Sequence, residues 1–179
     1  MSHKDYLLIG FVLLSAGLGF LLWREKRRRA GEISDRRILF PFDEYTLSMS
    51  ALEATLRIAR AEHATLVPDY LAVVPLRVSL DASLPRKSGK AVPLLDVIEM
   101  RAAEAGVPVD SRIEPGRSYR HALSRAFEQE RLDRVVIAAE SASGNGFRSA
   151  DIAWMLDHSV TELLVLKAAP DSAVNLASA

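Results

Sequence analysis

The sequence contains no cysteine among its 179 residues. Disulfide bonds, zinc sites built on thiolates and catalysis by a thiol are therefore excluded. Histidine is scarce as well, and the four histidines are scattered singly along the chain: His3, His63, His121 and His158. None of them stands at the spacing of a metal-binding pair, so the sequence predicts no metal site.

A basic stripe with interleaved aromatic residues is also missing. Residues 1–37 contain eight lysines and arginines against four acidic residues, whereas the rest of the chain contains 15 basic and 19 acidic residues. The larger part of the chain is thus mildly acidic, although the formal net charge of the whole is zero. A mildly acidic domain is a poor candidate for binding nucleic acid, and we predict no such partner.

A long uncharged run stands near the N-terminus, from Tyr6 to Trp23. As a helix it would span about 27 Å, just enough to cross the hydrocarbon core of a bilayer. A cleavable signal peptide is the alternative, but its positive charge precedes the apolar run, whereas here five basic residues follow within 24–29. We therefore predict a retained single-pass anchor over residues 1–29. The positive-inside rule places the N-terminus outside the inner membrane and the domain in the cytoplasm.

Two features of this region suggest partners. Gly10 and Gly17 lie on one face of the predicted helix, while Ser15 and Gly19 lie on nearly the opposite face. Such small residues allow close packing against other membrane helices. The seven basic residues of Arg24–Arg37 would each contribute on the order of 1 kcal/mol against anionic lipid, or serve only to set the topology.

Beyond the linker, short apolar runs alternate with helical patterns. Runs that are apolar on both faces predict strands buried in a covered, mostly parallel sheet. The predicted strands are 37–43, 70–74, 107–113, 134–139 and 163–166. The predicted helices are 46–63, 94–105, 118–131 and one through 152–156. This alternation predicts a doubly wound α/β domain with right-handed crossovers.

Prolines and glycines set several of these boundaries. We expect Pro68 at the start of the second strand rather than in its middle, because proline cannot donate to a sheet ladder. The residues 76–92 are rich in turn formers and predict a surface loop. Gly106 suits a helix C-cap, and Pro115-Gly116 predicts a turn. Tyr119 is expected on the buried stripe of the helix that Ser118 caps.

Several segments resemble the universal stress protein family. Ile38-Leu39-Phe40-Pro41-Phe42-Asp43 is similar to the opening "I-L-V-P-V-D" of that family, and Ser48 and Ala51-Leu52 match its first helix. Val73-Val74-Pro75 and Gly116 match the ends of later elements. The resemblance implies a five-stranded parallel sheet in the order 3-2-1-4-5 over residues 37–168, with a linker at 30–36 and a flexible tail at 169–179.

The resemblance also implies a nucleotide site, in a degenerate form. Members that bind ATP carry a loop of spaced glycines after the fourth strand and an aspartate after the first strand. The aspartate is present as Asp43, but the first two glycine positions fall on Ala138 and Ser141, and the closing Gly-Ser falls near Ser149-Ala150. The candidate cofactor-binding residues are therefore Asp43, Ala138, Ser141, Gly144 and Ser149.

Side chains in place of glycine weaken the case for ATP. A phosphate loop offers backbone N–H groups through positive φ angles and close approach, and a Cβ atom at Ala138 or Ser141 restricts both. Glu140 and Asp151 add negative charge that a polyphosphate would repel, and Arg148 is the one nearby cation that compensates. We predict no bound cofactor, with ATP as the alternative.

Catalysis is not expected. No histidine is predicted beside the serines of the loop, so a hydrolase triad is unsupported. Asp43 alone could act as a general base, but a strand-terminal aspartate more often caps the following helix, which is the role we predict. The leading hypothesis is a non-catalytic accessory subunit of a larger membrane complex. Its alternatives are a membrane-tethered regulator that binds ATP and a homodimer paired through the edge strand Leu163–Leu166.

Overall fold

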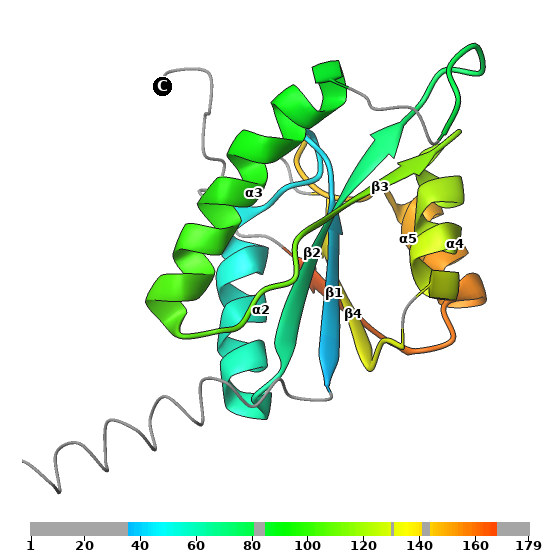
Figure 1. The fold of residues 1–179 in the computed structure, drawn as a ribbon. Helices are drawn as coiled ribbons and strands as arrows, with labels where there is room; N and C mark the ends of the chain where they lie inside the picture. The colour runs from blue at the N-terminus through cyan, green and yellow to red at the C-terminus, as the bar shows by residue number, and fades with distance from the viewer. Residues whose placement is uncertain (1–35, 81–84, 130, 141–143, 168–179) are drawn as a thin grey trace, which may run out of the picture. The chain divides into compact units, whose positions relative to one another are not determined.

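The computed structural model describes residues 36–80, 85–129, 131–140 and 144–167. Five parallel strands form one sheet in the order β3-β2-β1-β4-β5, which confirms the predicted order (Figure 1). The strands are β1 (Arg37–Phe42), β2 (Thr65–Val73), β3 (Arg112–Gly116), β4 (Arg134–Ala139) and β5 (Glu162–Lys167). The helices are α2 (Met49–Glu62), α3 (Pro85–Ala105), α4 (Tyr119–Gln129) and α5 (Ser149–His158).

The predicted anchor over 1–29 and the tail over 169–179 lie outside the described residues, as does the linker over 30–36 apart from Arg36. Within the described ranges, no helix combines the length and the apolar character needed to cross a bilayer.

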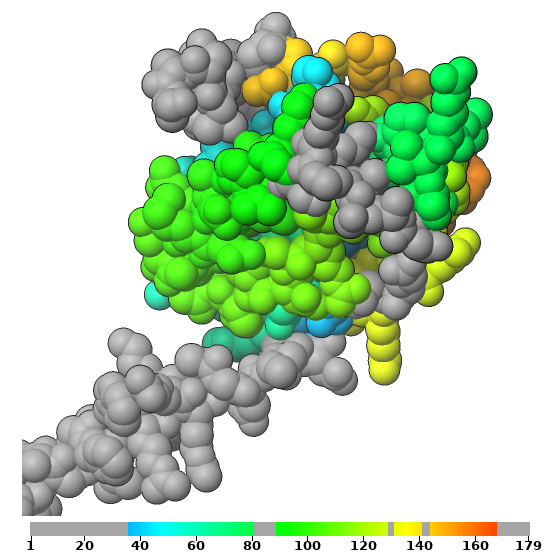
Figure 2. Space-filling view, turned by 45° about the horizontal axis from the view of Figure 1, so that its top comes forward, coloured from blue at the N-terminus to red at the C-terminus, as the bar shows by residue number. Residues whose placement is uncertain are grey.

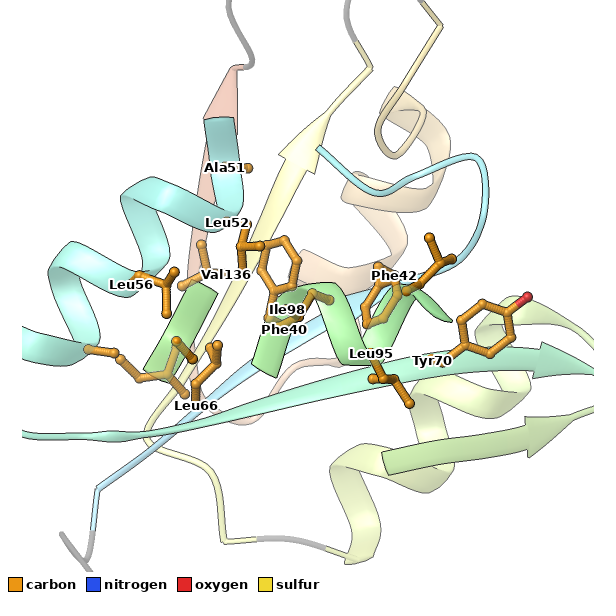
Figure 3. Close-up of a cluster of buried hydrophobic side chains, with 14 of the residues drawn as sticks. Phe40, Phe42, Ala51, Leu52, Leu56, Leu66, Tyr70, Leu95, Ile98 and Val136 are labelled. Carbon is orange, nitrogen blue, oxygen red and sulfur yellow. The ribbon is translucent and has the colours of Figure 1, made fainter. Parts of the chain in front are cut away.

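Two hydrophobic layers enclose the sheet, with α2 and α3 on one face and α4 and α5 on the other (Figure 1). Because side chains alternate along a strand, β1 sends Ile38, Phe40 and Phe42 to the first layer and Leu39 to the second. Figure 3 shows Phe42 beside Tyr70 of β2, where the ring centroids lie 5.7 Å apart in an edge-to-face arrangement. The same alternation places the next residue, Asp43, on the α4 side.

Helix α2 follows the capping rules. The Ser48 hydroxyl accepts a hydrogen bond from the Ala51 N–H, so Ser48 is the N-cap. At the other end His63 adopts the left-handed conformation with φ of 54°. The predicted range of 46–63 was therefore too long at both ends, because residues 43–46 form a separate turn.

Pro68 lies in the middle of β2, paired with Phe40 of the neighbouring strand, so the prediction that it begins the strand was wrong. The Leu66 N–H bonds to Pro108 on the β3 side, and alternate residues point the same way, so the nitrogen of Pro68 also faces β3. On that side Leu66 bridges Val109 and regular pairing resumes only at Asp69. The missing donor thus falls in a gap in the ladder, where it costs no hydrogen bond.

Strand β3 begins later than the predicted 107–113, and Pro115-Gly116 ends the strand rather than forming a turn. The prediction missed this strand because of Glu114, a buried charged residue. Its burial is tolerated because its carboxylate accepts a hydrogen bond from Arg125 Nε of α4 at 2.6 Å. A charged residue in a strand core breaks the apolar pattern that strand prediction depends on.

Helix α3 begins nine residues earlier than predicted, inside the expected surface loop. Proline is well suited to a first helical position, and Pro85 occupies it, whereas Pro93 lies inside the helix and removes one internal hydrogen bond. The predicted C-cap is confirmed: Gly106 has φ of 69°, and its N–H bonds to Ala103 O at 3.1 Å. In the space-filling view α3 forms a broad exposed surface (Figure 2).

The connection after β2 is fastened to the start of α4. Arg117 Nη1 donates to the carbonyl oxygens of Pro75 at 2.6 Å and Val78 at 2.8 Å, and lies 3.4 Å from that of Val74. The Arg117 N–H in turn donates to His121 Nδ1 at 3.1 Å. One side chain therefore joins this turn to the helix that borders the candidate site.

Candidate functional site

The candidate site is a crevice at the carboxyl ends of the strands, beside β1 and β4. Ligands bind at this position in doubly wound sheets, where the strand order reverses. The crevice consists of two cavities of about 320 and 240 Å³. The larger is lined by Asp43, Tyr45, Thr46, Tyr119, Arg120, Leu123, Glu140, Gly144, Gly146, Phe147, Arg148 and Asp151. The smaller is lined by Asp43, Glu44, Tyr70, Leu71, Ala72, Val73, Lys90 and Tyr119.

Asp43 stands at the centre, because it lines both cavities and is only 3% exposed. Its Oδ1 accepts hydrogen bonds from the Tyr45 N–H at 2.9 Å, the Thr46 N–H at 2.7 Å and the Thr46 hydroxyl at 2.8 Å. These bonds close a tight turn immediately after β1. Asp43 therefore caps this turn and not helix α2, and our helix-capping prediction was wrong.

Tyr119, the first residue of α4, also lines both cavities. Burial, and then the neighbouring Asp43 carboxylate, raise the pKa of Tyr119 far above its ordinary value, since both oppose the phenolate. Tyr119 is 41% exposed, so its predicted place on the buried stripe of the helix was wrong.

The smaller cavity is lined by two tyrosines and by charged residues. Tyr70 is buried there, and burial, followed by the charges of Glu44 and Asp43, raises its pKa. Lys90 of α3 donates to Glu44 at 2.7 Å across the rim. Its pKa is raised because Glu44 accepts this hydrogen bond and attracts its charge. The cavity thus combines two tyrosine rings and the apolar side chains of β2 with the charged groups of Asp43, Glu44 and Lys90.

Charge in the larger cavity is mixed. Arg120 donates from Nε and Nη2 to Asp151 Oδ1 at 3.2 and 3.1 Å, and its guanidinium lies 5.7 Å from the centre of the Trp154 ring. Arg148 precedes α5 and makes no ion pair with any described residue. Glu140 and Asp151 oppose these two cations, so the cavity has no strong field of either sign.

Three described amides at the ends of the loop after β4 are bonded within the protein. The Phe147 N–H bonds to Ala138 O at 2.8 Å, the Glu140 N–H bonds to Phe147 O at 2.8 Å, and the Gly146 N–H lies 3.4 Å from Tyr45 O. Gly146 has φ of 115°, and a Cβ atom there would lie 2.5 Å from Ala139 O. The glycine is thus needed for the return of the chain, and these three donors point into the protein rather than to a phosphate.

No family model matches this sequence, and neither does any curated protein. Solved structures do match. A protein of the universal stress protein family from Burkholderia pseudomallei superposes with a TM-score of 0.57 at 22% identity, over 74% of this chain and 96% of the other. A universal stress protein in complex with cAMP gives 0.54 at 19% identity, over 75% and 98% of the two chains. An Arabidopsis thaliana member with AMP bound gives 0.56 at 17% identity, over 78% and 96%.

The domain has the universal stress protein fold. Within it, the structure brings together two of the five residues predicted at the site, because Asp43 and Gly144 both line the larger cavity. Ala138 lies inside β4, 2% exposed, and packs in the α2/α3 layer. Ser149 is exposed at the start of α5 and lines neither cavity, and Ser141 lies outside the described residues.

Sequence reasoning missed most of the other residues that line the crevice. Tyr119, Tyr70 and Lys90 come from three different elements, and no local pattern links them. One sequence feature could have identified Tyr119. It begins a helix that follows the carboxyl end of a strand, a position that faces the crevice in this fold class. Groups of three or more potential metal ligands are absent from the described part of the chain.

Proposed function

We propose that this protein is a non-catalytic regulatory domain whose crevice binds an adenine nucleotide with a single phosphate. The observation that carries the proposal is the pair of cavities that meet at Asp43. One has an aromatic wall that suits a base, and the other contains two arginines that suit a phosphate. Each cavity is near the lower limit of roughly 300 Å³ for ligand pockets, and together they fall within the usual range. The structural neighbours with AMP and cAMP support this class of ligand.

A single phosphate fits better than three because of charge and donors. The larger cavity contains Arg120 and Arg148 but also Glu140 and Asp151, so each additional phosphate charge meets repulsion as well as attraction. The amides of Glu140, Gly146 and Phe147 beside the loop after β4 are bonded within the protein and do not face a polyphosphate. We therefore expect AMP to bind more tightly than ATP.

Calorimetric titration of the full-length protein with AMP, cAMP and ATP tests this. We expect saturable binding of AMP or cAMP and weaker binding of ATP. Asp43→Asn is the informative variant, because the amide oxygen still accepts the backbone bonds of the turn while the negative charge is lost. Tighter binding of ATP than of AMP, or no binding of any of the three, would contradict the proposal. Incubation of the nucleotides with the protein should leave them chemically unchanged.

A second candidate function is an accessory subunit of a membrane complex, located in the inner membrane. The uncharged run Tyr6–Trp23 and the basic residues that follow it favour this role. Gentle solubilisation of the full-length protein should then recover it with a multi-span partner. Migration alone as a monomer would argue against this role. A homodimer would instead favour pairing through β5, where Val165 is 37% exposed.

Both functions are compatible, since a tethered domain can report nucleotide binding to a membrane partner. They are tested independently, because the first is measured by titration and the second by co-purification.

A further inference from the structure

Arg120 and Asp151 join the first turns of α4 and α5 beside the larger cavity. Both helices cover the same face of the sheet (Figure 1). Arg120 is the second residue of α4 and Asp151 is the third residue of α5, and both line the larger cavity. One of the two arginines proposed for the phosphate is therefore already paired with a carboxylate of the protein itself.

This pairing uses most of the donors that Arg120 could offer to a phosphate. An arginine has five N–H donors in a planar fork, and it binds a phosphate best through two parallel hydrogen bonds. Nε and Nη2 both donate to Asp151 Oδ1, at 3.2 and 3.1 Å, and Nη2 also lies 3.2 Å from Ala150 O. Within the residues that the structure describes, Nη1 alone has no acceptor. A phosphate that takes the Nε and Nη2 edge must therefore displace Asp151.

A third contact from α5 keeps the Arg120 side chain in this position. Its guanidinium lies 5.7 Å from the centre of the Trp154 ring, within the range of a cation–π interaction. The Trp154 ring in turn stacks on His158, with 4.5 Å between the ring centres. The side chains of Arg120 and Asp151 are 47% and 36% exposed, so a ligand can reach both of them from solvent.

The other arginine of the cavity has different surroundings. Arg148 precedes α5 and lines the same cavity, and it makes no ion pair with any described residue. A ligand therefore meets one unpaired cation and one cation that Asp151 already neutralises. The unpaired cation suits one phosphate group, whereas further phosphate groups require Arg120 as well.

We infer that Asp151 is the residue that limits the site to a single phosphate, because its carboxylate occupies Arg120 in the place of a further phosphate group. This inference rests on the proposed function, and it names the residue that sets the number of phosphates. ATP has to break the bonds between Arg120 and Asp151, and it then lies beside a carboxylate that has lost its partner. AMP can bind at Arg148 and leave the pair intact.

Calorimetric titration of the full-length protein and its Asp151→Asn variant with AMP, ATP and adenosine tests the inference. Asparagine keeps the size of the side chain and an oxygen acceptor, and it removes the charge. A hydrogen bond to a charged group corresponds to a change in affinity of about tenfold or more, so we expect the variant to bind ATP about tenfold more tightly. The gain should be smaller for AMP. Adenosine has no phosphate and should bind both proteins equally.

Asp157→Asn is the matched control. Asp157 is an exposed residue of the same helix, and it lines neither cavity. The control variant removes the same charge and should leave all three affinities unchanged. An equal gain for ATP in Asp157→Asn would reveal a general effect of net charge and would overturn the role of Asp151.

Arg120→Gln shows whether Asp151 acts through Arg120. If Asp151 occupies Arg120, the gain from Asp151→Asn should be smaller in the Arg120→Gln background, because there is no cation left to release. If Asp151 only repels the phosphates, the gain should be as large or larger in that background, because no arginine neutralises its charge. The second result would overturn the inference.

The titrations also separate the inference from the proposed function. If the wild type binds AMP but Asp151→Asn binds ATP no better than the wild type does, the role of Asp151 is refuted and the proposed function stands. Binding of ATP by the variant and not by the wild type supports the inference in its strongest form. If neither protein binds a nucleotide, the proposed function fails, and the inference fails with it.

Discussion

Gly116→Ala is the substitution from which we expect the clearest loss of stability. Gly116 ends β3, where a Cβ atom would lie 2.4 Å from Ala122 N and 2.8 Å from Ala122 Cα. Both are backbone atoms of α4, so no side-chain rotation can relieve the contact, and the helix must move away from the sheet. Overpacking of this kind costs about 1–3 kcal/mol, and we expect a value near the upper end because a whole helix has to shift.

Thermal unfolding of the full-length protein, followed by circular dichroism, measures this effect. For a chain of this size, about 1 kcal/mol corresponds to a change in Tm of about 2–4 °C, so Gly116→Ala should unfold about 6–12 °C below the wild type. Gly89→Ala is the matched control. Gly89 lies in α3 with no atom within 4 Å of an added Cβ, so alanine should raise stability by about 0.5–1 kcal/mol.

The decisive result is that Tm should fall in Gly116→Ala and rise in Gly89→Ala. An unchanged or higher Tm for Gly116→Ala would show that α4 does not pack against β3 as described. Since α4 also carries Tyr119, that result would remove the basis for the crevice geometry as well.

Two further changes test buried and partly buried ion pairs. Arg125→Met removes the cation bonded to Glu114, whose side chain is 10% exposed, and should cost about 3 kcal/mol by chemical denaturation. Adding Glu114→Leu should recover most of that loss, and a single variant as stable as the wild type would show that the pair is not buried. Asp110 has a pKa below its ordinary value, first because Arg112 and then Arg37 donate hydrogen bonds to its carboxylate. The folded-state pKa is the lower one, so this stabilisation is present above pH about 4 and is lost as the pH falls through the depressed pKa. Because the Asp110 side chain is 40% exposed, we expect Asp110→Asn to reduce the acid sensitivity of unfolding by less than about 1 kcal/mol, and an unchanged pH profile would refute the assignment.

The central strands were predictable from uninterrupted apolar runs, whereas their order in the sheet was predicted from the resemblance to the universal stress protein family. Residues 37–42 and 134–139 are apolar on both faces, which only a central strand of a covered sheet allows. The start of α2 was less predictable, because Asp43 and Ser48 are both good capping residues. Which of them caps the helix depends on Thr46, whose hydroxyl and N–H both bond to Asp43.

The errors in the fold have a common cause, which is that neighbouring strands and helices override local preference. Pro68 is tolerated in β2 because β3 leaves a gap in the ladder beside it. Glu114 is tolerated in β3 because Arg125 reaches it from α4. Neither partner can be identified from the residues adjacent to Pro68 or Glu114 in the sequence.

The part of the site at the end of a single strand was predictable. The part formed by the packing of separate strands and helices was not. Asp43 was found because it ends the first strand. Tyr119, 76 positions later in the sequence, lines the same two cavities as Asp43 only because β3 and α4 bring it across the top of the sheet. Its aromatic ring at a helical position favoured a place in the core, and only the structure shows that it lines the crevice instead.

The hydrogen bonds of Arg117 connect the helix beside the crevice to the surface residues 75–78. Its guanidinium donates hydrogen bonds to the carbonyl oxygens of Pro75 and Val78, while its N–H bonds to His121 in the first turn of α4, which begins at Tyr119. Within residues 75–78, Leu76 is 86% exposed. If the first turn of α4 shifts when a ligand enters the crevice, either these hydrogen bonds break or residues 75–78 move with the helix. In the second case ligand binding would change the position of Leu76, an exposed apolar residue that a neighbouring protein can contact.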